Sequence, residues 1–372
     1  MTLARETYLD WNATAPLRPE AAAAIAEALA LGGNPSSVHR RGRVARQLVE
    51  RSREAIAALG GASADGVVFT SGGTEANQLA LLGSGRERVL VSAIEHSSVL
   101  QAVTDAERIP VDDNGIVKLT ALTALLAADP RPAMVSVMLA NNETGVIQPV
   151  AEIAEIAHAH GALFHCDAVQ AAGKVPLSLP DIGADFMTLS AHKIGGPSGI
   201  GALVLAPGVE LTPLLCGGGQ ERNRRAGTEN LSGIAGFAAA ARVCDPAEYA
   251  RVRHLRDRFG AALPEAVIVA GDAPRLPNTA AIAMPGVPAE TQIIAFDLDG
   301  VMVSAGAACS SGKVGPSHVL AAMGVAPEIA SATIRVSLGW STSEVEIAHF
   351  IDAWTALYRR TRGRDRTTAK AA

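Results

Sequence analysis

The stretch "PVAEIAEIAHAHGALFHCDAVQ", from Pro149 to Gln170, contains one helix followed directly by one strand. Apolar side chains recur at helical spacing in its first half, at Val150, Ile153, Ile156 and Ala157. Gly161 then ends the helix, and "ALFHCDAVQ" has the composition of a buried strand. A helix that feeds into an apolar strand is the unit from which parallel sheets are built, so this stretch predicts an α/β fold.

The same alternation extends from about residue 65 to about residue 205. Short β-rich runs occupy residues 66–72, 88–96, 133–142, 162–170, 185–193 and 201–208, with helical or loop stretches between them. Strands of this kind indicate a mixed, mostly parallel sheet that is covered by helices on both faces. Such sheets bind ligands beyond the carboxyl ends of their strands, where we therefore expect the functional residues.

The remainder of the chain predicts a smaller α+β domain. We expect helices at residues 248–263, 290–300, 317–324 and from about Ser343, and strands at residues 279–286, 301–306 and 332–339. The predicted division is a large domain of residues 15–248 and a small domain of residues 1–14 and 249–372. The basic end of the chain, from about residue 360, is expected to be a disordered, solvated tail.

The composition excludes several classes of protein. The net charge of −5 gives no electrostatic reason to expect nucleic acid or a membrane surface as a partner. No apolar run resembles a signal peptide or approaches the ~18–20 residues of a membrane span. The four cysteines, Cys166, Cys216, Cys244 and Cys309, are far apart, which disfavours a disulfide framework or a zinc site. We expect a protein of the reducing cytoplasm.

Asp167 and Lys193 are the most informative pair of residues. Each lies at the end of a predicted strand of the same sheet, in "FHCDAVQ" and "MTLSAHKIGG". A buried lysine is unfavourable unless it is paired or used covalently. In a pyridoxal phosphate site, lysine forms a Schiff base with the cofactor and a carboxylate keeps the pyridine nitrogen protonated. An ordinary ion pair is the alternative for these two residues taken alone.

Other segments add weaker signals of the same kind. Gly73 and Thr74 lie at a predicted helix N-terminus in "FTSGGTEANQ", where free N–H groups can bind a phosphate, although an ordinary N-cap explains them equally well. His96 follows a sheet strand and could stack on a flat cofactor and carry protons. The histidines and cysteine of "HAHGALFHCD" point to different sides of their helix and strand, so we expect no permanent metal site. The glycine clusters do not follow the pattern of a dinucleotide-binding fold.

Taken together, these segments resemble the cysteine desulfurases, fold-type I pyridoxal phosphate enzymes of the class V aminotransferase superfamily. The matching segments, in the order of the family, are "YLDWNATAPLRPE", "NPSSVHRRGR", "FTSGGTEANQ", "EHSSVL", "NNETGVIQPV", "HCDAVQAAGK", "SAHKIGGPSGIGAL", "GGGQERNRRAGTEN", "GAACSSGKVGPSHVL" and "IRVSLGWSTSEVE". The cysteine segment resembles the subgroup that serves iron–sulfur assembly. Gly195 and Ser198 replace an aromatic residue and a lysine that are usual after the Schiff-base lysine, which concerns the loop rather than the chemistry.

The resemblance implies a role for each matching residue. Lys193 is the Schiff-base lysine, Asp167 the partner of the pyridine nitrogen, His96 the stacking and proton-carrying residue, and Gln170 the partner of the phenolic oxygen. The implied phosphate ligands are Gly73, Thr74, Ser190 and His192, with Thr228 reaching the phosphate of the neighbouring subunit of a homodimer. Asn142 lies beside cofactor and substrate, and Arg335 binds the substrate carboxylate.

The resemblance also implies an activity. L-Cysteine is converted to L-alanine, and its sulfur passes to Cys309 as a persulfide, through which Cys309 could transiently ligate an iron–sulfur cluster. The sulfur then goes to an acceptor or iron–sulfur scaffold protein, or serves thiolation. Another class V enzyme, such as an aminotransferase, a selenocysteine lyase or a sulfinate desulfinase, remains the first alternative. An inactive assembly scaffold is the second, which the presence of Asp167, Lys193 and Cys309 disfavours.

Overall fold

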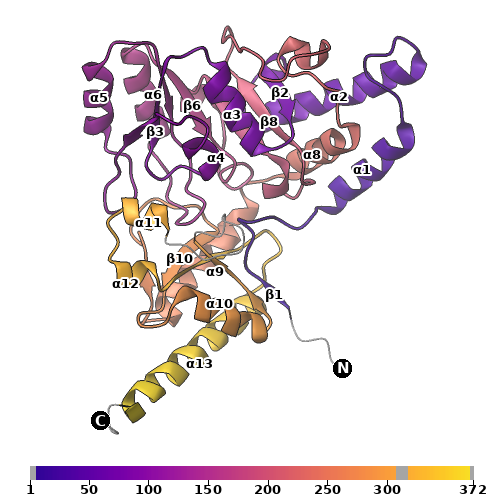
Figure 1. Cartoon of the computed structure of the whole chain (residues 1–372). Helices are drawn as coiled ribbons and strands as arrows, with labels where there is room; N and C mark the ends of the chain where they lie inside the picture. The colour runs from indigo at the N-terminus through magenta and orange to yellow at the C-terminus, as the bar shows by residue number, and fades with distance from the viewer. Residues whose placement is uncertain (1–5, 307–316, 369–372) are drawn as a thin grey trace.

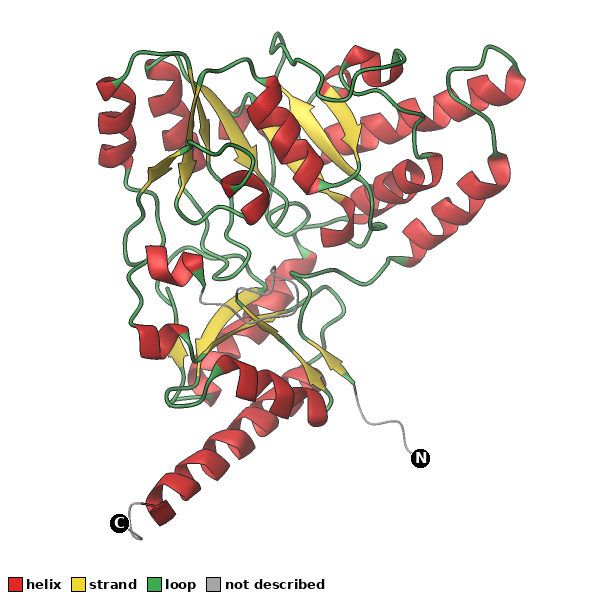
Figure 2. Cartoon of the chain, in the orientation of Figure 1, coloured by secondary structure: helices red, strands yellow, loops and turns green. Residues whose placement is uncertain are grey.

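The computed structural model describes residues 6–306 and 317–368, and its largest element is a seven-stranded sheet (Figures 1 and 2). The strands, in spatial order, are β2 (Val67–Thr70), β8 (Gly201–Leu205), β7 (Phe186–Ser190), β6 (Leu163–Asp167), β5 (Ala133–Ser136), β3 (Arg88–Ser92) and β4 (Glu107–Ile109). All neighbours from β7 to β4 are parallel, whereas β8 is antiparallel to both of its neighbours. The predicted mixed, mostly parallel sheet is confirmed.

Helices cover both faces of this sheet because successive strand residues point to opposite sides. On one face, Phe69 and Val204 pack in a core cluster with residues of α2, α5, α6 and α8, whereas Val68 and Leu203 pack on the other face with α3 and α4. The helices of this part are α1 (Pro19–Leu31), α2 (Arg40–Leu59), α3 (Gly73–Gly83), α4 (Ser97–Leu100), α5 (Leu119–Ala128), α6 (Val150–Ala159), α7 (Leu179–Ile182) and α8 (Leu231–Val243), with short 3₁₀ turns η1 (Ala64–Gly66), η2 (Ala191–Lys193) and η3 (Gln220–Asn223).

The remaining described chain forms a second layer around an antiparallel sheet, shown below the large sheet in Figure 1. Its strands, in order, are β12 (Ser304–Ala305), β13 (Thr333–Ser337), β10 (Thr279–Ala283) and β9 (Val267–Ile268). The helices are α9 (Glu248–Ala262), α10 (Ala289–Leu298), α11 (His318–Ala322), α12 (Pro327–Ala330) and α13 (Glu344–Thr368). Leu9 joins their core cluster, which otherwise contains residues from Tyr249 onward. The exact domain limits stay a prediction.

The segment "VMVSAG" differs from its prediction as a single strand. It forms two short strands in different sheets: β11 (Val301–Met302) pairs in parallel with β1 (Thr7–Tyr8), and β12 pairs with β13. The sequence pattern could not show this change of partner, because it depends on where the N-terminal segment lies.

The C-terminal helix also differs from its prediction. α13 continues to Thr368, past residue 360, at which the disordered tail was expected to begin.

No helix in the described part of the chain is both long enough and apolar enough to span a membrane.

A buried ion pair fixes an unusual turn at η3. Glu221, Arg222 and Asn223 all have left-handed backbone conformations, with φ of 46°, 57° and 63°, which is unfavourable for residues with a side chain. The carboxylate of Glu221 accepts bonds from Arg53 at 2.7 and 3.1 Å and from the backbone N–H of Phe69 at 2.9 Å. Both charged side chains are 3% exposed, so each depends on the other for its charge to be tolerated.

We expect Glu221→Ala to lower the free energy of unfolding by about 3 kcal/mol, because the buried Arg53 guanidinium loses its bidentate partner and keeps the half-exposed Glu50 carboxylate, 3.5 Å from its Nε. Urea-induced unfolding followed by circular dichroism measures the loss. The double variant Arg53→Met/Glu221→Leu should be less destabilised than Glu221→Ala, since it buries no unpaired charge. A single variant as stable as the parent protein would show that the pair does not hold the turn.

Candidate active site

A cavity of about 350 Å³ lies beyond the carboxyl ends of the parallel strands. Its lining includes every predicted site residue that the structure describes except Thr228, namely Gly73, Thr74, His96, Asn142, Asp167, Gln170, Ser190, His192, Lys193 and Arg335. Among the described residues, seven more line it: Asn12, Ala13, Asn77, Ser98, Met138, Ala140 and Val169. The cavity is therefore formed where the sequence predicted a site, at the edge at which the strands end.

Consecutive strands each deliver part of the lining. Gly73 and Thr74 begin α3, just after β2, and His96 follows β3. Asp167 is the last residue of β6, and Ser190 is the last residue of β7, directly before the turn η2 that contains Lys193. Arg335 alone among the predicted residues of the cavity comes from the second layer, from β13. The cavity thus lies between the two layers.

Neutral donors orient the carboxylate of Asp167. Asn77 of α3 donates to Oδ2 at 2.8 Å, and the backbone N–H of Val169 donates to Oδ1 at 3.0 Å. The side chain is largely buried, with 6% of the residue exposed. These donors fix the position of the carboxylate without cancelling its charge, so it suits a cationic partner such as a protonated pyridine nitrogen.

Asn77 also connects Asp167 to His96. Its Nδ2 donates to the hydroxyl of Ser98 at 2.9 Å, and Nδ1 of His96 accepts from the backbone N–H of Ser98 at 3.1 Å. Because a backbone N–H can only donate, the neutral imidazole carries its proton on Nε2. Burial lowers the pKa of His96 from its ordinary value, although the Asp167 carboxylate opposes this shift. His96 is therefore a neutral ring whose N–H donor is Nε2, the nitrogen that does not accept from Ser98.

The Nζ of Lys193 is held by backbone carbonyls of the N-terminal segment. It donates to the oxygen of Asn12 at 2.6 Å and to the oxygen of Ala13 at 2.8 Å. The same Asn12 oxygen accepts from Nε2 of Gln170 at 3.0 Å. A primary amine held by neutral acceptors at a cavity wall is placed to react with a carbonyl carbon of a bound molecule.

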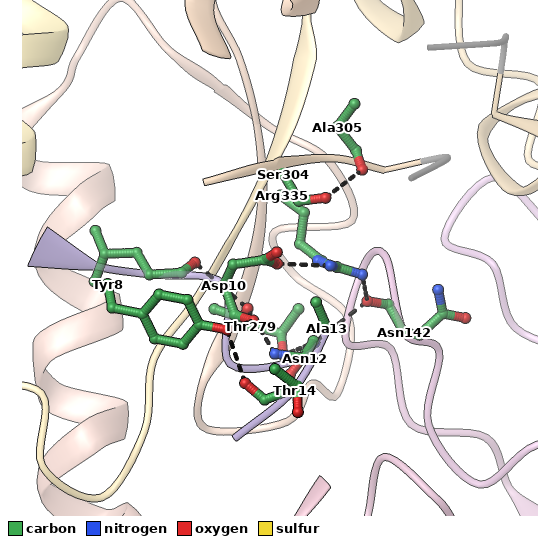
Figure 3. A network of polar contacts seen from close by, with 12 residues as sticks. Tyr8, Asp10, Asn12, Ala13, Thr14, Asn142, Thr279, Ser304, Ala305 and Arg335 are labelled. Atoms are coloured by element: carbon green, nitrogen blue, oxygen red, sulfur yellow. Dashed lines mark hydrogen bonds and ion pairs between the residues drawn. The ribbon is translucent and has the colours of Figure 1, made fainter. Parts of the chain in front are cut away.

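Figure 3 shows how Arg335 is oriented from two sides. Its Nη2 donates to Oδ1 of Asp10 at 2.7 Å, and its Nη1 donates to the backbone oxygen of Asn142 at 3.1 Å. The residue is 4% exposed. These bonds occupy two of its five N–H donors, and a planar guanidinium fixed in this way can still present a pair of donors to a carboxylate in the cavity.

The other end of the cavity fits a phosphate. The N-terminus of α3 offers backbone N–H groups at Gly73 and Thr74 that have no partner within the helix, and Ser190 and His192 add polar side chains. A Cβ at Gly73 would lie 3.1 Å from Cγ2 of Val169, so glycine keeps this approach open. Burial and the nearby Lys193 lower the pKa of His192 to about 4, so its ring is neutral at physiological pH. The residues present therefore fit pyridoxal phosphate along the whole cavity.

One predicted residue lies elsewhere, and a second is not among the described residues. Thr228 is exposed and lines a separate hollow of about 190 Å³ together with Glu221 and Arg225, so it does not reach the cavity of its own chain. Cys309 lies outside the described residues. The nearest described neighbours on its two sides, Gly306 and Ser317, both adjoin Glu143: Ser317 Oγ donates to its Oε2 at 2.6 Å, and a Cβ at Gly306 would be 2.6 Å from the same atom.

The sequence analysis did not assign Asn12, Asn77 or Asp10, although all three lie in segments that matched the family. Each acts through contacts with residues distant in sequence, which no local pattern encodes.

The "HAHGALFHCD" histidines have other partners: His165 bonds Ser136 and Thr188, and His158 bonds Asp185. Among residues 6–306 and 317–368, no cluster of histidine, cysteine and acidic side chains is arranged to hold a metal ion.

Comparisons with known proteins agree with this geometry. The family model "Aminotransferase class-V" matches residues 7–350. A cysteine desulfurase from Cereibacter sphaeroides is 43% identical over 93% of this chain and 94% of its own length, and cysteine desulfurase IscS from Dictyoglomus turgidum is 38% identical over 96% of each chain. The crystal structure of a NifS-like protein from Rickettsia africae superposes with a TM-score of 0.88 and 37% identity, covering 95% of this chain and 100% of that one.

These similarities extend over nearly the whole described chain and include both layers, so they apply to the complete cavity rather than to one motif. This cavity contains a buried carboxylate, a lysine held at the wall and an oriented arginine. The chain therefore belongs to the class V aminotransferase family, within its group of cysteine desulfurases.

Proposed function

We propose that this cysteine desulfurase uses the cavity to hold pyridoxal 5′-phosphate and L-cysteine, and uses Cys309 to accept the sulfur as a persulfide. The observation that carries the proposal is that Asp167, Lys193 and Arg335 line one cavity although they come from three different strands or turns. The residues with assigned roles in the cavity are Gly73, Thr74, His96, Asn142, Asp167, Gln170, Ser190, His192, Lys193 and Arg335.

When bound, the cofactor supplies a protonated aromatic ring that withdraws electrons from the substrate. Lys193 would hold it covalently through Nζ, Asp167 would pair with its ring nitrogen, and the N-terminus of α3 with Ser190 and His192 would bind its phosphate. His96 would cover the ring, and its Nε2–H can donate a proton to a leaving or developing anion. Arg335 would orient the substrate through its carboxylate, with Asn142 beside it.

The sulfur transfer balances without an added oxidant or reductant. The C–S bond of cysteine breaks, an S–S bond forms to the Cys309 thiolate, and the β-carbon gains a proton to give alanine. The hydrogen bond of Glu143 with Ser317 and its position beside Gly306, where a Cβ would meet it, support this role, since Glu143 follows Asn142 of the cavity directly. Burial raises the pKa of Cys166 well above its ordinary value and that of Cys244 to about 11, so both disfavour the reactive thiolate.

The wider role is also part of this proposal. We infer a cytoplasmic homodimer in which Thr228 completes the phosphate site of the partner subunit, because Thr228 lies away from the cavity of its own chain. The acceptor of the sulfur would be a scaffold protein of iron–sulfur assembly or a thiolation enzyme, consistent with the similarity to a protein named IscS. No nucleic acid or membrane partner is proposed.

Cys309→Ser tests the sulfur-transfer step. We expect it to retain the visible absorption of the bound cofactor and to lose persulfide formation, because only the transfer needs a thiolate. Purified enzyme is exposed briefly to cysteine without reductant, alkylated, and digested for mass analysis. The parent protein should gain the mass of one sulfur on the peptide that contains Cys309.

The serine variants of Cys166, Cys216 and Cys244 are the matched controls and should retain turnover. Lys193→Ala is the opposite control, since it should lose the imine absorption of the cofactor while Cys309 is intact. A sulfur found on another cysteine, together with turnover by Cys309→Ser, would refute the assignment.

Arg335→Lys tests substrate orientation. We expect kcat/KM for cysteine to fall by about tenfold or more, mostly through KM, because lysine cannot bond Asp10, the Asn142 carbonyl and a carboxylate in one plane. Steady-state alanine production measures the effect. Arg251→Lys is the control, since Arg251 also donates to two backbone carbonyls, at Trp340 and Thr342, but does not line the cavity. Equal use of cysteamine, which has no carboxylate, and cysteine by the parent enzyme would contradict the assignment.

A mixed dimer tests the placement of Thr228. Thr228→Val should weaken cofactor binding about threefold to tenfold through the lost hydrogen bond. A heterodimer of one Lys193→Ala chain and one Thr228→Val chain should keep about half of the parent activity, because one of its sites has an intact lysine and receives an intact threonine from the other chain. If Thr228 served its own site, the same heterodimer would have no intact site, and its activity at low cofactor would fall to about half of that of the Thr228→Val homodimer.

A further inference from the structure

Lys174 is a buried lysine that the proposed reaction does not use. It lies in "HCDAVQAAGK", seven residues after Asp167, and only 3% of it is exposed. Its Nζ donates to the backbone oxygen of Gln170 at 2.9 Å and to the side-chain Oε1 of Gln170 at 3.1 Å. Burial, and then the neighbouring Lys193, lower the pKa of Lys174 to about 7. Both acceptors belong to a neutral residue, although a buried lysine usually pairs with a carboxylate.

The partners of Gln170 decide which way its amide faces. The Asn12 carbonyl can only accept, so the atom 3.0 Å from it must be Nε2. Oε1 then faces Lys174, which donates to it whether or not the amine is protonated. Since Gln170 lines the cavity, the second hydrogen of its Nε2 is the polar group that this amide can offer to a bound molecule. The reversed amide would bring Oε1 against the Asn12 carbonyl, where two acceptors repel.

We propose that Lys174 is a positioning residue, which holds Oε1 of Gln170 away from the cavity so that Nε2–H is offered to an anionic oxygen of the bound cofactor. The inference rests on the proposed function, in which Gln170 bonds the phenolic oxygen of pyridoxal phosphate. The contacts form one series, from Lys174 to Gln170, to the Asn12 carbonyl and to Lys193. Lys174 therefore acts on the site through hydrogen bonds and without touching the cofactor.

A double-mutant cycle tests this series. Lys174→Met and Gln170→Met remove each partner with little change of length, and both are compared with the parent and with the double variant. The first measurement is the dissociation constant for pyridoxal phosphate. The second is the pH midpoint of the visible absorption band of the bound cofactor, which a purely structural loss would not move.

We expect each single variant to weaken cofactor binding about threefold to tenfold and to raise the midpoint by about 0.5 to 1 pH unit, because the lost donor leaves the more anionic form less stabilised. In the Gln170→Met background, adding Lys174→Met should produce less than half of the change that it produces in the parent. A change of the same size in both backgrounds, or no change in either, would overturn the proposal.

Val175→Ala is the matched control, since Val175 is the next residue and packs against the core without bonding Gln170. It should lower the melting temperature and leave the midpoint unchanged. If Lys174→Met does not fold, Lys174→Gln replaces it in the same cycle, because its amide is polar but one atom too short to reach Oε1.

Alanine production by the parent holoenzyme is measured in parallel. A parent without this activity contradicts the proposed function, whereas additive variants of an active parent contradict the role of Lys174 alone.

Discussion

The site depends on the backbone and side chain of Asn12, which is 1% exposed and lies where the two layers meet (Figure 3). Its carbonyl accepts from both Lys193 and Gln170. Its side chain donates to Thr279 of β10 at 2.9 Å and to the Asn142 carbonyl at 3.2 Å, and accepts from Asn278 at 3.0 Å. A buried amide left without partners is unfavourable by about 1–3 kcal/mol for each group, so these bonds hold the N-terminal segment in one place.

The same constraint explains how the layers share a single cavity. The first layer supplies the proposed cofactor-binding residues at the ends of its strands, whereas the second supplies Arg335. Asp10, two residues before Asn12, bonds Arg335, so the N-terminal segment positions the amine of one layer and the guanidinium of the other. The distance between the proposed cofactor attachment point and the proposed carboxylate site is therefore set by one short piece of chain.

Burial controls the charges around the cavity. It raises the pKa of Glu95 to about 8, so the neutral form of this acid is favoured at pH 7, and it also raises the pKa of Glu143. It also lowers the pKa of His96 and His192, which keeps both rings uncharged. Among the described residues of the lining, the carboxylate of Asp167 lies at one wall, and the Lys193 amine and the Arg335 guanidinium lie at others. In a site of low dielectric such an arrangement discriminates strongly between ligands of different charge.

Sequence alone was enough to predict the mixed, mostly parallel sheet, the helices on both faces and a site at the strand ends, because hydrophobic periodicity and the end of a strand are local properties. It also named Asp167, Lys193 and, through the resemblance to a family, Arg335 as candidate residues, and these three line one cavity. It could not assign Asn12, Asn77 or Asp10, or show that Lys174 lies behind Gln170, because hydrogen-bond partners up to hundreds of residues apart are decided only when the chain is packed. The division of "VMVSAG" between two sheets has the same cause: a strand takes its partner from tertiary structure, whereas its extended conformation is already favoured by its own residues.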